Sequence, residues 1–167
     1  MIVRMHWLLR KGLMTYDPSA RPAGELDFQR IFNLTPGMCL VLDPGFTIVA
    51  QNEEHARATL SIAKDVVGRN LFAVFPDNPN HYSADGVSTV RSSLLKVLKT
   101  RQPDAMPLIR YDVKGERGPY QERWWQITNM PVLGDDGYVS WIINRAEDVT
   151  ELVKLRETVS ATVKPTR

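Results

Sequence analysis

Side chains that could bind a small polar molecule are concentrated in the later part of the chain. They are, in order, Arg110, Tyr111, Arg123, Trp125, Asn129 and Asn144. Guanidinium and amide groups each form several hydrogen bonds, while indole and phenol rings combine an apolar face with one polar atom. This combination favours reversible binding, and we take these six residues as the candidate ligand site.

Alternation along two late segments sorts these side chains by face. Residues two apart in a strand point to the same side of a sheet, so Trp125 shares a face with Arg123 and Asn129. In the next segment Asn144 shares a face with Ile142. If this face meets helices it lines a pocket. Amides there need water or a polar ligand, because a buried amide without a hydrogen bond costs about 1–3 kcal/mol.

A second interpretation of the same residues involves no ligand. In this alternative the polar groups face solvent, Trp125 belongs to the core, and Asn129 satisfies a local turn. Arg123 then pairs with Asp112 or Glu122 across strands. The sequence leaves both interpretations open.

Residues for catalysis or metal binding form no recognisable pattern. The single cysteine, Cys39, lies in an apolar run, which predicts a buried small side chain and a reducing compartment. His55 follows two glutamates in a polar helical segment and His81 lies in a proline-rich loop, so we expect both imidazoles to be exposed. The sequence shows no metal-ligand spacing and no glycine-rich phosphate loop. We therefore expect no metal and no enzyme activity.

Length and composition indicate one ordinary globular domain with flanking tails. The chain has 167 residues, of which 43% are hydrophobic and 24% charged, with a net charge of +2. Basic residues are scattered, so nucleic acid is not an expected partner. The uncharged runs in residues 1–14 are far shorter than the ~20 residues of a membrane span. We expect a cytoplasmic protein without membrane contact.

The order of elements predicts an α+β fold. A short helix over residues 26–32 precedes strands 38–42 and 46–50, which the turn Asp43-Pro44-Gly45 joins in a hairpin. Helical pieces follow from Asn52, and a longer helix with one apolar stripe begins near Gly86. Three more strands are predicted, over residues 105–113, 120–133 and 138–147. Together these elements indicate a five-stranded antiparallel sheet with helices on one face.

The residues at the joints of this pattern resemble the PAS family of sensory domains. Thr35-Pro36-Gly37 resembles the entry to the family's first strand, and Ile48-Val49-Ala50-Gln51-Asn52 its second strand and capped helix. Val67-Gly68-Arg69-Asn70-Leu71-Phe72 resembles the segment before the ligand-facing helix. Glu147-Asp148-Val149-Thr150 is similar to the exit signature, the most specific of the four. The resemblance covers about residues 27–150.

The end of the chain predicts a helix that leaves the sheet directly. Asp148 is expected to cap this helix, with Thr150 next in line and Glu151 completing a capping box. Beyond it Leu152, Leu155 and Val159 keep an a/d spacing that could pair two copies. We divide the chain into an N-terminal arm and linker (1–25), a PAS-like domain (26–148), and a C-terminal signalling helix and tail (149–167).

The resemblance implies a binding and signalling role. We expect a sensory domain, of the type found in bacterial sensor kinases and two-component regulators, that binds an unknown small molecule or dimerises and acts on a histidine kinase or transcriptional regulator. Haem is not expected, because the helix from Gly86 has no histidine. A photoreceptor flavin is not expected either, because Cys39 lies in a strand and not in a helix. The alternatives are a ligand-free interaction scaffold and, with least support, a small enzyme.

Overall fold

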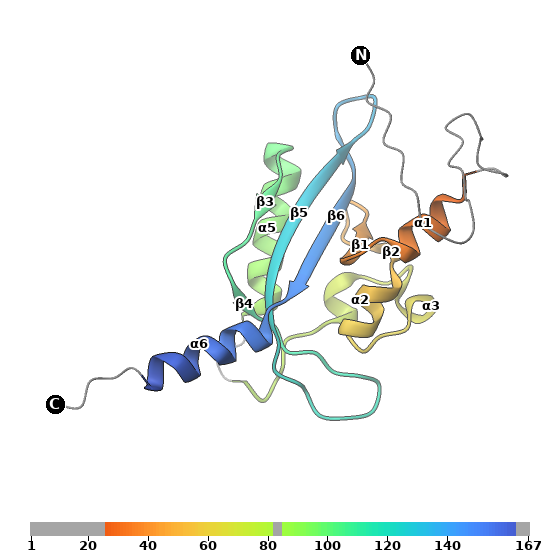
Figure 1. Cartoon of the computed structure of the whole chain (residues 1–167). Coiled ribbons are helices and arrows are strands. Elements are labelled where there is room, and N and C mark those ends of the chain that lie inside the picture. Colours follow the sequence, from red (N-terminus) through yellow and green to blue (C-terminus); the bar gives the residue numbers. More distant parts are fainter. Residues whose placement is uncertain (1–25, 82–84, 163–167) are drawn as a thin grey trace, which may run out of the picture.

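The computed structural model describes residues 26–81 and 85–162 (Figure 1). The predicted N-terminal arm and linker, residues 1–25, lies outside the described residues. The elements follow one another as α1 (Phe28–Leu34), β1 (Met38–Leu42), β2 (Ile48–Gln51), α2 (Glu53–Ala58), α3 (Ala63–Val66), α4 (Leu71–Val74), α5 (Gly86–Thr100), β3 (Asp104–Ala105), β4 (Ile109–Arg110), β5 (Trp124–Leu133), β6 (Val139–Asp148) and α6 (Thr150–Thr162).

The strands form one antiparallel sheet in the order β2-β1-β6-β5-β3, and β4 also pairs with β5. The predicted α+β class is thus confirmed. So is the first hairpin, in which the Asp43 carboxylate accepts a hydrogen bond from the N–H of Thr47 at 2.7 Å. The β5–β6 hairpin turns at Gly137, whose φ of 75° suits a residue without a side chain.

The sheet has six strands where five were predicted. The segment expected as one strand over residues 105–113 forms two short strands, β3 and β4, along the same edge of β5. Pro107 lies between them, and a proline cannot donate to a strand ladder. The predicted strand over residues 120–133 likewise becomes regular only at Trp124.

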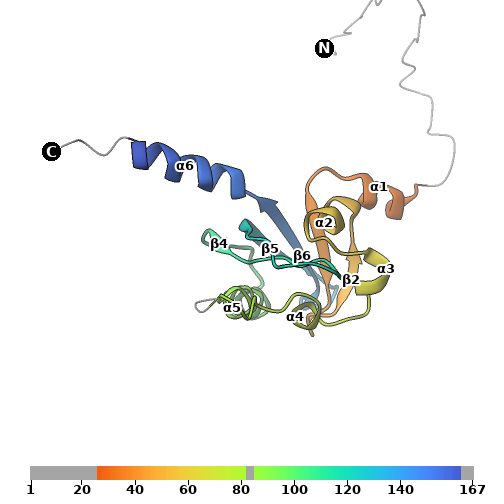
Figure 2. The same ribbon diagram turned by 90° about the horizontal axis from the view of Figure 1, so that it is seen from below.

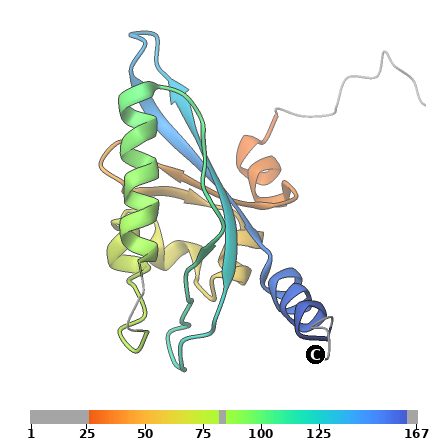
Figure 3. The same cartoon turned by 90° about the vertical axis from the view of Figure 1, so that its left-hand side faces the viewer.

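Helix α5 lies along the β5–β6 hairpin, as its apolar stripe predicts (Figure 3). Val90, Leu94 and Val97 on this stripe are buried. The view in Figure 2 shows α4 on the same side of the sheet as α5. Burying three such side chains contributes about 1.5–3 kcal/mol each, so α5 is fixed against the sheet.

Two helices remain outside the core. Helix α1 lies on the opposite side of the sheet from α5 (Figure 3), and its apolar residue Phe28 is 73% exposed. The amphipathic spacing predicted the helix correctly, but none of its residues is fully buried. Helix α6 extends away from the sheet (Figure 1). Across residues 26–81 and 85–162, no helix is both long and apolar enough to cross a membrane.

Candidate functional site

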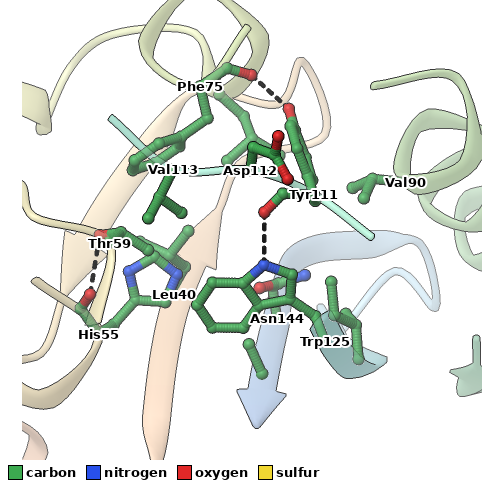
Figure 4. Close-up of a pocket in the computed structure, with 13 residues that line it drawn as sticks. Leu40, His55, Thr59, Phe75, Val90, Tyr111, Asp112, Val113, Trp125 and Asn144 are labelled. Carbon is green, nitrogen blue, oxygen red and sulfur yellow. Dashed lines mark hydrogen bonds between the residues drawn. The ribbon is translucent and has the colours of Figure 1, made fainter. Parts of the chain in front are cut away.

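A cavity of about 60 Å³ lies between the sheet and the helices (Figure 4). This is several times the ~10–15 Å³ that one water molecule needs. Its walls are mostly apolar, and the aliphatic lining residues are Leu40, Leu71, Val90, Val113, Ile127 and Ala146. A few polar groups among apolar walls is the composition typical of small-molecule sites, although this cavity is smaller than the ~300–1,000 Å³ of most of them.

Hydrogen bonds hold two aromatic side chains in place along one wall of the cavity. The indole N–H of Trp125 donates to the backbone carbonyl of Tyr111 at 2.7 Å, and the Tyr111 hydroxyl donates to the carbonyl of Phe75 (Figure 4). Burial raises the pKa of Tyr111, so its hydroxyl stays protonated and keeps donating. Both predicted aromatic site residues, Tyr111 and Trp125, therefore line the cavity in fixed positions.

His55 also lines the cavity, and the prediction that it is exposed was wrong. Only 4% of its surface is accessible, and burial lowers its pKa to about 4. The two preceding glutamates lie in the first turn of α2, where the helix dipole favours them whichever way the next residue points. Thr59, four residues further on, lies on the same face and also lines the cavity.

Two further expectations for single side chains need correction. Cys39, predicted to be buried, is only half-buried in β1. His81, predicted to be exposed, is half-buried beside a small hollow of about 30 Å³. Within the described residues no three His, Cys, Asp or Glu side chains come together to hold a metal ion.

The two asparagines face each other across β5 and β6. They are register partners, and the Asn144 amide Nδ2 donates to Asn129 Oδ1 at 2.7 Å. Both are buried, so the alternative in which they face solvent does not hold. Asn144 lines the cavity, whereas Asn129 lies behind it and hydrogen-bonds to Ser93 of α5. Asn129 satisfies no local turn.

The two predicted arginines lie away from the cavity. Arg110 donates from Nε to Asp112 at 2.9 Å and pairs with Glu122, also at 2.9 Å. Burial would raise the pKa of Asp112, but hydrogen bonds from Arg110 and Asn78 outweigh it and lower that pKa. The Asp112 carboxylate, which reaches the cavity wall, is thus already matched by a positive charge.

Arg123 belongs to the exit from the sheet. Its Nε lies 3.2 Å from a carboxylate oxygen of Asp148, close enough for an ion pair although the N–H does not point at that oxygen. The buried Thr150 hydroxyl accepts from the backbone N–H of Trp124 at 3.0 Å. The start of α6 is therefore tied to the start of β5.

The sequence predicted a direct handover from strand to helix, and β6 does end two residues before α6 begins. The predicted capping box was wrong in its details. The Asp148 carboxylate accepts from the N–H of Thr150 at 2.9 Å, while Glu151 pairs with Lys154 in the following turn. The strand continues to Asp148, which leaves that residue one position too early to act as the cap.

Comparison with known proteins assigns the fold to a family. A family model described as the PAS fold matches residues 32–154. The chain therefore belongs to the PAS family, a class of domains typical of sensory and signalling proteins. No curated protein matches the chain.

Solved structures with this fold include several signalling proteins. An RNA-binding Light-Oxygen-Voltage receptor is 24% identical with a TM-score of 0.59 over 79% of this chain, which spans only 36% of that receptor. A PAS domain from Colwellia psychrerythraea is 12% identical with a TM-score of 0.57, over 73% of this chain and 93% of that one. VqmA bound to DPO is 19% identical with a TM-score of 0.55, over 71% of this chain and 55% of that one. At these identities the likeness concerns the fold alone.

Proposed function

We propose that this PAS domain is a sensory module that binds a small molecule in the cavity and passes its state through α6 to an output partner. The main support comes from two neighbouring residues of β5. The indole of Trp125 lines the cavity, while the backbone N–H of Trp124 donates to Thr150 at the start of α6. A ligand that repositions Trp125 would therefore change the hydrogen bond between Trp124 and Thr150 that holds the start of α6.

Such a sensor needs differential binding and no chemical step. A ligand shifts a conformational equilibrium only by the difference between its affinities for the two states. The mostly apolar lining, with a few polar groups, suits reversible binding. VqmA, one of the proteins with a similar fold, is described as bound to DPO.

The proposed output route is a helix that meets a second copy. Leu152, Leu155 and Val159 keep the a/d spacing on α6 and are 48%, 61% and 54% exposed. We propose that these residues pair in a homodimer whose partner helices lead to a histidine kinase or a transcriptional regulator in the cytoplasm. The division into a sensory domain over residues 26–148 and a signalling helix after it is part of this proposal.

A ligand-free interaction scaffold is the second candidate. It is favoured by two apolar side chains on the outer side of the β5–β6 hairpin, the register partners Val132 and Trp141, which are 37% and 43% exposed. Apolar residues gathered on one face commonly mark a protein contact. In this alternative the domain pairs with another protein, and the cavity has no role.

Native and denaturing mass spectrometry of the protein isolated from its own cells separates the two candidates. The sensor proposal expects a dimer with an additional small mass that is lost on denaturation. Val90→Phe, which places an aromatic ring in the cavity wall, should abolish that mass. Leu95→Phe makes the same kind of change at an exposed site of α5 and should retain it. A dimer without additional mass in the native protein would favour the scaffold.

A further inference from the structure

A chain of hydrogen bonds runs from the cavity to the protein surface. Asn144 Nδ2 donates to Asn129 Oδ1 at 2.7 Å, and Asn129 Nδ2 donates to Ser93 Oγ at 2.8 Å. The Ser93 hydroxyl donates to Asp104 Oδ2 at 2.6 Å. The other carboxylate oxygen of Asp104 accepts from the exposed Lys96 ammonium, also at 2.6 Å. Three elements, β6, β5 and α5, thus contribute to one polar path ending at β3.

The Asp104 carboxylate determines which group donates and which accepts in each of these hydrogen bonds. Hydrogen bonds from Lys96 and Ser93 lower the pKa of Asp104, so its carboxylate is ionised and can only accept. Ser93 must then donate to Asp104 and accept from Asn129, which in turn accepts from Asn144. One of the two N–H groups of Asn144 Nδ2 is used in the bond to Asn129, and none of the described residues donates to Asn144 Oδ1. Since Asn144 lines the cavity, it offers a hydrogen-bond acceptor there.

A second series of hydrogen bonds determines which ring nitrogen of His55 accepts and which carries the proton. The Thr59 hydroxyl donates to the backbone carbonyl of His55 at 2.8 Å, and a carbonyl only accepts. Thr59 therefore accepts from the Ser61 hydroxyl, 2.9 Å away, and Ser61 accepts from Gln51 Nε2 at 2.8 Å. The same amide nitrogen lies 2.9 Å from His55 Nδ1. Because this end of Gln51 is a donor, Nδ1 must accept.

His55 consequently offers a donor. A neutral imidazole that accepts at Nδ1 carries its proton on Nε2. Burial lowers the pKa of His55 to about 4, so the ring is neutral at pH 7. In Figure 4 one ring nitrogen of His55 lies toward the indole of Trp125 in the cavity wall.

We infer that the cavity selects a small neutral molecule with an apolar body that carries one hydrogen-bond acceptor for His55 Nε2–H and one donor for Asn144 Oδ1. The inference rests on the proposed function, in which the cavity holds a ligand. Asn129 and Gln51 act as positioning residues, because they set which atoms of Asn144 and His55 face the ligand.

The lining disfavours charged ligands. Among the described residues that line the cavity, Asp112 is the only one with an ionised side chain at pH 7, and its charge is matched by Arg110. A carboxylate or ammonium ligand would lose its hydration without gaining a counter-ion. A neutral ligand that satisfies both polar atoms loses less, and each good hydrogen bond corresponds to about tenfold in affinity.

The test uses size-matched probes on the whole chain, with binding followed by the NMR shifts of the Trp125 indole N–H and the Asn144 amide. Benzene has neither group, pyridine only the acceptor, pyrrole only the donor, and 2-pyridone both. We expect 2-pyridone to bind about tenfold more tightly than pyridine or pyrrole, and those two about tenfold more tightly than benzene. Benzoate and benzylamine should not bind.

Two variants of His55 identify the donor. His55→Asn keeps a polar group near Nδ1 but removes Nε2–H, so pyridine and 2-pyridone should lose about tenfold in affinity while pyrrole is unchanged. His55→Gln places an amide near Nε2 and should restore the loss. Equal affinities for benzene and 2-pyridone, or tighter binding of a charged probe, would overturn the ligand class and leave the cavity as a binding site. If no probe binds the wild-type protein, the proposed function fails as well.

Discussion

The burial of His55 makes stability depend on pH in a defined range. Its pKa is lowered from 6.5 to about 4 in the folded protein, so between these values the unfolded chain binds a proton that the folded protein excludes. The contribution is fully present above about pH 6.5 and is lost as the pH falls toward 4. A difference of about 2.5 pKa units, at ~1.36 kcal/mol each, amounts to about 3 kcal/mol, of which about 2 kcal/mol is lost by pH 5.

Urea unfolding followed by tryptophan fluorescence between pH 4 and 7.5 measures this effect. The matched variant is His55→Asn, which keeps a neutral partner for Gln51 and cannot take up a proton. The variant starts from lower stability because it leaves space in the cavity wall, so the informative quantity is the change with pH. We expect the stability gap between wild type and variant to shrink by about 2 kcal/mol from pH 7.5 to 5. Parallel curves would refute the claim that His55 is buried in its neutral form.

Two other substitutions test the cavity wall and the exit. A Cβ on residue 86 would lie 2.6 Å from the Tyr111 ring, so Gly86→Ala should cost about 1–3 kcal/mol in urea unfolding. Gly115→Ala, whose new Cβ would meet Leu60 at an ordinary 3.5 Å, should cost less than about 1 kcal/mol; equal costs would contradict the packing of Tyr111. Thr150→Val removes the acceptor of the Trp124 N–H and should cost about 1–3 kcal/mol and speed hydrogen exchange at that amide. The control Thr158→Val, on the exposed side of α6, should change stability by less than about 0.5 kcal/mol. Unchanged hydrogen exchange at the Trp124 amide in Thr150→Val would show that the hydrogen bond between Trp124 and Thr150 is absent.

The sheet and its buried face could be predicted because periodicity reports burial. Alternation placed Trp125 and Asn129 on one side and Asn144 on the corresponding side of the next strand, and all three are buried. The stripe on α5 was equally informative. Pro107 was the missed signal for the break between β3 and β4, since it removes a backbone donor in the middle of the expected strand.

Pairing between side chains was harder to predict. Arg110 and Arg123 alternate as cavity residues would, but their partners Asp112, Glu122 and Asp148 draw them to ion pairs outside the cavity. The burial of His55 was missed for a different reason. Its helix is short and polar, so the sequence holds too few apolar residues to reveal which face of the helix points inward. Sequence spacing reports which face a residue occupies, while its hydrogen-bond partner depends on the tertiary structure.

The central claim is that the state of the cavity reaches α6. Hydrogen exchange measured by mass spectrometry on Val90→Phe tests it directly, because the new ring enters the cavity from α5, and none of the described residues of α6 lines that cavity. The account predicts a changed exchange rate at Trp124 and over residues 149–155 relative to wild type, and no such change in Leu95→Phe. Changes confined to α5 and the cavity wall, with exchange at the start of α6 identical in all three proteins, would contradict the proposed route.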